Sequence, residues 1–241
     1  MFNWWCTRRN ILPGDLLVNR IDIHTHLLPG VDDGVKTEEE ALAILQLLAT
    51  HGVKKVFCTP HVMTDLVKNH SGYLKARFRE FQKLCPVNIE LRLAAEYMLD
   101  EHFLCHLKEG LLAFDKKHVL LETSYLDAPP NMERLLYETT LYGYQPILAH
   151  PERYLYMEPE NYTLLKERNC KFQLNLLSVA GYYGKEVQYR SKDLLRKGYY
   201  DFIGSDIHHL KQYKSYYSLS LPLSLIKTLK ALIRKNEELW I

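Results

Sequence analysis

The chain has few features of a secreted, membrane-spanning or low-complexity protein. Its five cysteines are scattered over 241 residues and form no Cys-x-x-Cys pair, which disfavours both a disulfide framework and a thiolate zinc site. The 11 glycines and 10 prolines are too few for a collagen-like or low-complexity chain. No apolar run approaches the ~18 residues needed to span a bilayer. These absences favour a cytoplasmic protein with reduced thiols.

The start of the chain also lacks the pattern of a secretory signal. Aromatic residues precede the charged ones in residues 1–9, and neither an apolar h-region nor a small-residue cleavage site is present. We expect residues 1–18 to form an N-terminal arm and residues 19–241 to form a single domain.

Several functional classes find no support in the sequence. The 31 basic residues nearly balance the 29 acidic ones, so no nucleic-acid partner is expected. No cysteine is followed six positions later by an arginine, as a cysteine-dependent phosphatase requires. The chain has neither a Walker A motif nor a Gly-x-Ser-x-Gly elbow, so P-loop nucleotide hydrolysis and serine-esterase chemistry are unsupported.

Short β-rich runs alternate with longer helical patterns along most of the chain. The predicted strands cover residues 20–26, 54–61, 89–96, 119–123, 146–150, 171–176 and 201–206. The predicted helices cover residues 41–52, 71–84, 132–142, 159–168, 184–197 and 222–238. Thr37 and Glu40 form a predicted capping box before the first helix. This order predicts an α/β domain with a parallel sheet, and seven strands favour a barrel of the (β/α)7 type.

Metal-ligand side chains occur at the carboxyl ends of six of these seven strands. In a β/α barrel those ends converge on the face that carries the active site. The candidate ligands are His24, His26, Asp33, His61, Glu96, Glu122, His150, Asp206 and His208. Nine candidates exceed what one ion binds, so we expect two or three ions bridged by carboxylates.

The ligand types indicate the chemistry. His24 and His26, two apart on a strand, project to one face. Imidazole and carboxylate ligands without thiolate suit Mn²⁺, Fe²⁺ or Zn²⁺. Such ions lower the pKa of bound water to about 7 and stabilise an in-line displacement at phosphorus. Arg153 would add a bidentate contact to a phosphoryl oxygen.

Seven motifs carry a family resemblance: DIHTH, GVDDG, TPH, AAEY, LLET, AHPER and GSDIHH, in this order between about residues 20 and 210. They resemble the PHP (polymerase and histidinol phosphatase) superfamily, and more closely its bacterial protein-tyrosine phosphatases of capsule and exopolysaccharide loci (the CpsB/YwqE type). The resemblance implies a distorted β/α barrel with a trinuclear, usually Mn²⁺-dependent site. It also implies a phosphotyrosyl substrate, a tyrosine autokinase that controls polysaccharide export, and work at the inner face of the membrane.

The resemblance also implies how the ligands are shared. One metal would take His24, His26, Glu122 and Asp206, with Glu122 bridging. A second would take His61, Glu96 and His150. A third would take Asp33 and His208, with help from a bridging carboxylate. Arg153 matches the family's phosphate-binding arginine, and Asp206 and His208 are counted as catalytic residues with it.

Two positions depart from the family pattern. Val62 stands where a second histidine often follows TPH. Lys211 and Lys214 occur where the family often has a second arginine, and a lysine lacks the planar guanidinium fork. These departures bear most on substrate preference.

Several residues have competing interpretations. We expect Asp22 to orient a histidine rather than to bind metal. By motif position we prefer Asp33 to Asp32 as a ligand. Arg153 could instead pair with Glu152 or with an acidic ligand. We expect His209 to support the site or lie at the surface, and His102 and His106 to lie on a helix face.

The predicted function is that of a metal-dependent protein-tyrosine phosphatase, a phosphoric monoester hydrolase. The nearest alternative is a phosphatase for a small phosphoester such as histidinol phosphate. Nuclease activity is disfavoured because the chain has no basic stripe and no companion domain. A non-catalytic module that binds a kinase is the alternative from a different class, and the intact ligand set disfavours it.

Overall fold

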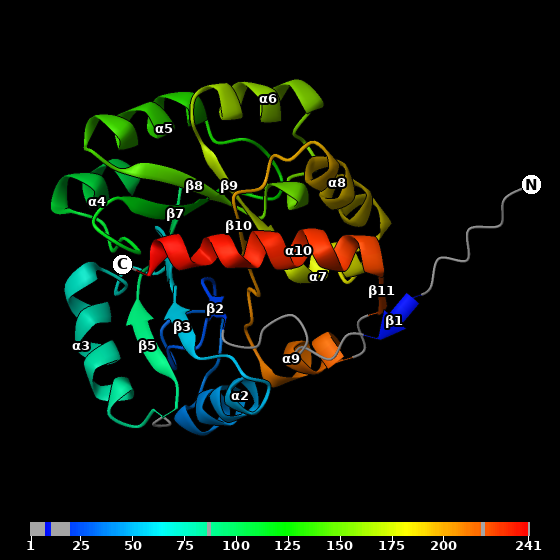
Figure 1. Cartoon of the computed structure of the whole chain (residues 1–241). Coiled ribbons are helices and arrows are strands. Elements are labelled where there is room, and N and C mark those ends of the chain that lie inside the picture. Colours follow the sequence, from blue (N-terminus) through cyan, green and yellow to red (C-terminus); the bar gives the residue numbers. More distant parts are fainter. Residues whose placement is uncertain (1–7, 11–19, 86–87, 218–219, 241) are drawn as a thin grey trace, which may run out of the picture.

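The computed structural model describes residues 8–10, 20–85, 88–217 and 220–240 (Figure 1). Nine parallel strands form its centre: β2 (Ile21–Asp22), β3 (Lys55–Cys58), β4 (His61–Val62), β5 (Glu90–Leu93), β6 (Glu96–Met98), β7 (His118–Glu122), β8 (Gln145–Ala149), β9 (Lys171–Asn175) and β10 (Phe202–Gly204). One sheet has the order β10-β9-β8-β7-β6-β4, and a second has the order β2-β3-β5.

Backbone hydrogen bonds join the first and last segments of this arrangement. Thr25, after β2, forms a parallel bridge with Ile207, after β10. The amide of Asp206 donates to the carbonyl of His24, and the amide of His26 donates to the carbonyl of Ile207, each over 2.8 Å. The predicted α/β class with parallel strands is confirmed, and this bridge joins the two parallel sheets of the described residues at β2 and β10.

Two predicted strands are interrupted. The run predicted at residues 54–61 divides into β3 and β4 at Thr59 and Pro60, because proline has no N–H to donate to a ladder. The run predicted at residues 89–96 divides into β5 and β6 at Ala94 and Ala95, where the Ala95 amide bonds to the carbonyl of Leu112 instead. Each break comes just before a candidate ligand: β4 begins at His61 and β6 begins at Glu96. The chain therefore changes direction immediately before each of these two side chains.

Helices lie outside the strands (Figure 1). They are α2 (Glu38–Thr50), α3 (Ser71–Gln82), α4 (Phe103–Glu109), α5 (Met132–Leu141), α6 (Pro159–Glu167), α7 (Leu176–Ala180), α8 (Lys185–Arg196), α9 (Leu210–Tyr217) and α10 (Leu223–Lys235), with short 3-10 turns η1 (Pro151–Arg153) and η2 (Asn236–Leu239). The six predicted helices are all present. Helix α10 ends before residue 238, and α7 and α9 were not predicted.

The predicted capping box at α2 is half formed. The Thr37 hydroxyl accepts a hydrogen bond from the Glu40 amide at 3.2 Å, as expected for an N-cap. The Glu40 carboxylate does not bond back to Thr37; it accepts from the amide of Leu210 at 3.0 Å. Glu40 thus connects α2 to the start of α9, which follows the last candidate ligands in the chain.

Two hydrophobic clusters support the strands. The larger one packs the strands against the surrounding helices. The smaller one includes Phe57, Phe114 and Trp240, whose rings meet edge to face at 4.9 Å and 4.6 Å from Phe57. Burial on both faces explains why the strands read as continuous apolar runs in the sequence.

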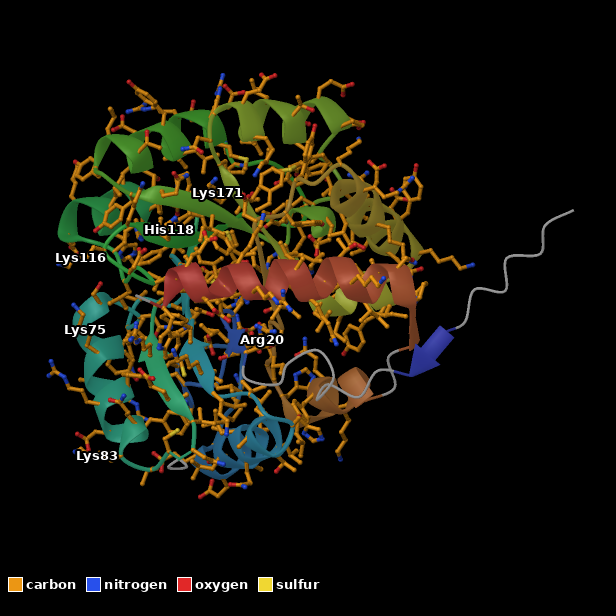
Figure 2. All side chains as sticks on the ribbon, in the orientation of Figure 1. Arg20, Lys75, Lys83, Lys116, His118 and Lys171 are labelled. Carbon is orange, nitrogen blue, oxygen red and sulfur yellow. The ribbon has the colours of Figure 1, made fainter. Side chains whose placement is uncertain are left out.

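The C-terminal segment packs against the starts of the strands. Asn236 donates to the carbonyls of Ile21 and Ile203. Glu237, in η2, accepts from Arg20, which immediately precedes β2 and is labelled in Figure 2. The candidate ligands lie at the opposite, carboxyl ends of the strands. The predicted closing role of residues 222–241 therefore agrees with these contacts, with residue 241 outside the described part.

Part of the predicted N-terminal arm is described. Strand β1 (Arg8–Asn10) pairs antiparallel with β11 (Ser220–Pro222). Residues 1–7 and 11–19 lie outside the described residues. Among the helices that are described, none has the length and apolar character required to cross a bilayer.

Candidate metal centre

The nine predicted ligands come together at the carboxyl ends of the strands. Six of them are buried: His24, His26, Glu96, Glu122, His150 and Asp206. His61 and His208 are partly exposed, and the side chain of Asp33 is 73% exposed. The chain thus collects five imidazoles and four carboxylates in one place, although their positions in the sequence span residues 24 to 208.

The ligand atoms fall into three overlapping groups, within each of which all atoms lie no more than 4.8 Å apart. These groups are His26, Asp33, His61 and His208; His24, Glu96, His150 and Asp206; and His61, Glu96 and Glu122. His61 and Glu96 each belong to two groups. The overlap is the geometry expected for neighbouring ions that share ligands.

Glu96 is the carboxylate that links the groups. Its Oε2 lies 3.0 Å from Nε2 of His24, 3.2 Å from Nε2 of His26 and 3.3 Å from Nδ1 of His61. Its Oε1 lies 3.1 Å from Nε2 of His150. The backbone turn at Ala94 and Ala95 places Glu96 here, at the first position of β6.

This grouping differs from the sharing that the resemblance implies. Glu122 lies 2.7 Å from Nδ1 of His61, and it is grouped with His61 and Glu96 rather than with the pair His24 and His26. Asp206 Oδ1 is 3.4 Å from Nε2 of both His24 and His26. Glu96 rather than Glu122 is therefore the carboxylate that lies close to His24, His26, His61 and His150.

The candidate ligand atoms are arranged to bind a cation rather than to hydrogen-bond with one another. Within the described residues, Nδ1 of His61 is buried and has no hydrogen-bond partner, although a Glu122 oxygen is only 2.7 Å away. A buried polar atom without a partner costs about 1–3 kcal/mol. A metal ion bound by both side chains would remove that cost. Imidazole and carboxylate donors without thiolate suit Mn²⁺, Fe²⁺ or Zn²⁺.

The electrostatics of the cluster also favour bound cations. Burial alone would lower the pKa of His61, but Glu122 and Glu96 outweigh burial and raise it to about 9. Burial would raise the pKa of Glu96, but the adjacent His24 and His61 hold it well below its ordinary value. The Glu96 carboxylate therefore stays ionised at neutral pH, and the His61 imidazole binds a proton when no metal is present.

A second layer of polar side chains fixes the histidine rings. Oε1 of Gln173, on β9, lies 2.9 Å from Nδ1 of His24, which directs Nε2 of that ring into the cluster. Oδ2 of Asp32 lies 2.8 Å from Nδ1 of His26 in the same way. Gln173 was not predicted. A polar residue at a buried strand position is the signal that could have identified it.

The two aspartates of GVDDG point in different directions. Asp32 is buried behind His26 and also accepts from the amides of Gly34 and His61. Asp33 Oδ1 lies 3.4 Å from His61 Nε2 and 3.5 Å from His208 Nε2. The preference for Asp33 as the ligand agrees with this geometry.

Asp22 supports the site through the backbone. Its Oδ1 accepts from the amides of His24 and Ser205. Asp22 was predicted to orient a histidine, and the bond to the His24 amide agrees with that role. The two bonds together join the segments after β2 and β10. Within the described residues, Oδ2 of Asp22 has no hydrogen-bond partner.

Backbone conformation is unusual at the strand ends. His150 has φ 32° and Asp206 has φ 56°, values that non-glycine residues rarely adopt and that cost about 1–3 kcal/mol each. Both residues turn the chain sharply after a strand and direct a side chain into the cluster. Gly34 allows a close approach, since a Cβ there would lie 2.3 Å from the carbonyl oxygen of His26.

Arg153 joins the cluster from η1. Its Nη1 donates to Oδ2 of Asp206 at 2.8 Å, so the acidic partner considered from sequence is a candidate ligand. Glu152 instead lies buried on the other side, where it accepts from the Asn175 amide and the Tyr200 hydroxyl. Arg153 therefore faces the candidate metal ligands, and its neighbour in the sequence does not.

A cavity of about 950 Å³ opens over these groups. Its lining includes candidate ligands, Arg153, two methionines, and three tyrosines and one leucine from the β7–α5 and α7–α8 loops. The lining residues are Asp33, His61, Met63, Asp65, Leu66, Met98, Glu122, Ser124, Tyr125, Leu126, His150, Arg153, Tyr182, Tyr183, Asp206, His208, His209 and Gln212. The wall thus combines metal-ligand, cationic and apolar side chains.

The residues after His208 meet the cavity differently from the family pattern. His209 and Gln212 line it, whereas Lys211 and Lys214 are exposed on α9 and are not among its described lining residues. His102 and His106, which border and lie on α4, are also outside the cluster. Arg153 is the single arginine among the described lining residues.

The chain is similar to known proteins along most of its length. The family model described as capsular polysaccharide synthesis, CpsB/CapC, matches residues 20–218. The tyrosine-protein phosphatase YwqE of Bacillus subtilis is 29% identical over 204 residues, covering 79% of this chain and 78% of that protein. The tyrosine-protein phosphatase CpsB of Streptococcus pneumoniae is 27% identical over 206 residues, covering 79% and 83%.

Solved structures agree with these sequence matches. A crystal structure from work on YwqE of Bacillus subtilis and CpsB of Streptococcus pneumoniae, named there as unique metal-dependent tyrosine phosphatases, matches with a TM-score of 0.79. Its identity is 25%, and the match covers 91% of this chain and 93% of that chain. The phosphotriesterase homology protein of Escherichia coli, 12% identical with a TM-score of 0.53 over 93% and 99% of the chains, shares the fold alone. The matched range of the family model includes all nine candidate ligands, and the chain belongs to the capsular polysaccharide synthesis CpsB/CapC family.

Proposed function

We propose that the chain is a metal-dependent phosphatase that hydrolyses phosphotyrosine on protein. The observation that carries this proposal is the convergence of five imidazoles and four carboxylates in one cluster, beside a cavity that Arg153 and six of these side chains line. The relatives named as tyrosine-protein phosphatases support it. So does the structural match to metal-dependent tyrosine phosphatases.

The three groups of ligand atoms support two or three divalent ions. His24, Glu96, His150 and Asp206 would hold one, His26, Asp33, His61 and His208 another, and His61, Glu96 and Glu122 a third. Mn²⁺ is the ion we propose, with Fe²⁺ or Zn²⁺ as the alternatives that the same donors accept. When bound, such ions supply a hydroxide nucleophile at neutral pH and Lewis-acid stabilisation of phosphoryl oxygens.

The chain's own residues bind and orient the substrate. Arg153 provides guanidinium N–H groups for the phosphoryl oxygens, and a planar fork suits that contact. Asp206 holds Arg153 in place through the 2.8 Å ion pair. His208 bonds through Nδ1 to the carbonyl of Asp206 at 3.0 Å, which leaves Nε2 to face the cavity as a ligand.

A tyrosine phenolate as the leaving group suits the chemistry and the apolar lining of the cavity. A tyrosine phenolate has a pKa of about 10, so it departs with less need of a strong acid than an alkoxide does. Apolar side chains in the lining, among them Met63, Met98 and Leu126, can contact an aromatic ring. We propose a tyrosine autokinase of polysaccharide export as the phosphotyrosyl protein, and the inner face of the cytoplasmic membrane as the place of action. The four described cysteines are free, as is usual in a reducing compartment.

The test combines metal analysis with phosphate release. Purified protein is analysed for bound metal and then assayed on a phosphotyrosyl peptide and on histidinol phosphate, with and without added Mn²⁺. We expect two to three ions per chain and Mn²⁺-stimulated release from the peptide. Release from histidinol phosphate alone would favour the small phosphoester. Metal without release from either substrate would favour a kinase-binding module, and no metal after reconstitution would refute the proposal.

A pair of histidine variants sharpens this test. His150→Ala removes a buried candidate ligand and should abolish hydrolysis while the fold remains. His102→Ala is the matched control, because His102 is exposed beside α4 and its ring makes no capping bond. Full activity in His150→Ala would remove the metal mechanism. Equal losses in both variants would show that the effect is not specific to the centre.

A further inference from the structure

The guanidinium of Arg153 lies between two tyrosine rings. Its Cζ is 4.4 Å from the ring centroid of Tyr125 and 4.3 Å from that of Tyr183. We propose that Tyr125 and Tyr183 are positioning residues that hold the Arg153 guanidinium in the orientation that binds the phosphoryl group of the substrate. This inference rests on the proposed function, because it assigns a phosphate-binding role to Arg153.

The two rings come from separate segments of the chain. Tyr125 lies in the loop after β7, and Tyr183 lies between α7 and α8. Arg153 itself comes from η1, after β8. A cation above an aromatic face gains about 0.5–2 kcal/mol, more where water is excluded. The Arg153 side chain is only 19% exposed, so little water surrounds it. The two tyrosine rings therefore restrict the orientation of the guanidinium plane.

The ion pair with Asp206 completes the restraint. Nη1 of Arg153 donates to Oδ2 of Asp206. Among the described residues, no group accepts a hydrogen bond from Nε or Nη2 of Arg153. Arg153 lines the cavity, so these N–H groups are available to a bound phosphoryl oxygen. The two tyrosine rings fix the plane of the Arg153 guanidinium, and the bond to Asp206 fixes the rotation of the guanidinium within that plane.

The two tyrosines are held to different degrees. The Tyr183 hydroxyl accepts from Nδ2 of Asn175 at 3.2 Å and from Nε2 of Gln212 at 3.1 Å. Asn175 also donates to Oδ2 of Asp206, and the Gln212 amide donates to the carbonyl of Asp206. One hydrogen-bond network therefore joins Tyr183 to the carboxylate that pairs with Arg153.

Tyr125 is held by packing. Its ring lies 5.8 Å from that of Tyr154 and 5.9 Å from that of His150, and the residue is 43% exposed and lines the cavity. Loss of the hydroxyl should therefore matter at Tyr183 and matter little at Tyr125. Loss of the ring should matter at both positions, because each ring covers one face of the guanidinium.

A double-mutant cycle separates this role from direct contact with the substrate. Tyr125→Leu, Tyr183→Leu, Tyr125→Phe and Tyr183→Phe are made in the natural sequence and together with Arg153→Ala. Each Mn²⁺-loaded protein is measured by calorimetry for the affinity of inorganic phosphate and by steady-state kinetics for kcat/KM on the phosphotyrosyl peptide. Metal content is measured in parallel, and Tyr137→Leu, an exposed tyrosine of α5, is the matched control.

In the natural sequence each leucine variant should weaken phosphate binding about 3- to 20-fold, the range that a cation–π contact supplies. Tyr125→Phe should recover the loss to within about threefold, and Tyr183→Phe should recover less of it. In the Arg153→Ala background both leucine variants should change the affinity by less than about twofold. Tyr137→Leu should have no effect.

Equal losses in the two backgrounds would overturn the proposal, because the rings would then act on the substrate or the fold rather than on Arg153. A parallel loss of metal would overturn it as well. A chain that binds phosphate with this pattern but does not hydrolyse the peptide would refute the proposed function and leave the positioning role intact.

Discussion

Oδ2 of Asp32 lies 2.8 Å from Nδ1 of His26, and both side chains are buried. Burial would raise the pKa of Asp32, but the adjacent His26 outweighs it and lowers that pKa. The ionised carboxylate therefore holds a proton on Nδ1 and leaves Nε2 as the lone pair that faces the cluster. A candidate metal ligand is thus oriented by the aspartate six residues after it in the sequence.

Asp32→Asn should weaken metal binding about 10- to 100-fold, the usual effect of removing a carboxylate behind a ligating histidine. Competition with a chelating dye measures the affinity. Asp127→Asn, an exposed aspartate, is the control and should match the natural sequence. An unchanged metal affinity in Asp32→Asn would contradict the assigned role of the Asp32–His26 contact.

Gly204 leaves room for the side chain of His24, the other histidine of the pair His24 and His26. A Cβ at this position would lie 2.5 Å from Cβ of His24 and 3.0 Å from Nε2 of Gln173. We expect Gly204→Ala to lower the free energy of unfolding by about 1–3 kcal/mol, as overpacking does, and to reduce metal content. Urea unfolding and elemental analysis measure the two effects. Gly72→Ala, whose new Cβ would be 3.4 Å from the His70 ring, is the control, and equal behaviour of the two variants would disprove the steric argument.

Removal of metal should destabilise the whole domain. The candidate ligands lie in or after six different strands, β2, β4, β6, β7, β8 and β10, so bound ions would connect these parts of the domain. A ligand present at 1,000 times its Kd stabilises a protein by about 4 kcal/mol. We expect the Tm to fall on chelation and to recover when Mn²⁺ is returned, as followed by thermal denaturation. A chelator already saturated with Ca²⁺ is the control, and a Tm that does not change would argue against buried ions.

Stability should depend on pH through Asp115, far from the centre. Its carboxylate accepts from the amides of Lys117 and His118 and pairs with the His118 ring at the start of β7. Burial would raise the pKa of Asp115, but these contacts outweigh burial and lower it below 3.8. A lowered pKa means that the stabilisation is complete above the unfolded value and is lost as the pH falls through the folded one.

Asp115→Asn should therefore cost about 1 kcal/mol of unfolding free energy at pH 7, and the difference from the natural sequence should shrink as the pH falls below about 4. Urea unfolding at pH 7 and at about pH 3.5 measures both values. The exposed Asp127→Asn serves again as the control. A difference that grows in acid would contradict the sign of the pKa shift.

Some features of the fold were predictable from local patterns, and others were not. The helices and the seven strand regions could be predicted from the periodicity of apolar residues, because this signal is local and extends over only a few residues. The break at Pro60 has a local cause that the strand prediction overlooked. The short helix α7 also has local signals, because Asn175 caps its start and Gly181 ends it in the left-handed region, and the helix prediction overlooked them. The contact of Glu40 with Leu210 has no local signal, because it joins segments 170 residues apart.

The sequence by itself determined the chemistry of the site: imidazole and carboxylate donors at strand ends, with one arginine near them. Parallel strands in a barrel bring such ends together whatever the details of the packing. Only the tertiary structure decided which donors are neighbours. Glu96 rather than Glu122 contacts both His24 and His150, and Arg153 lies between Tyr125 and Tyr183. Those relationships depend on strand register and loop course across some 180 residues, and shifts of a few ångströms in either would change them.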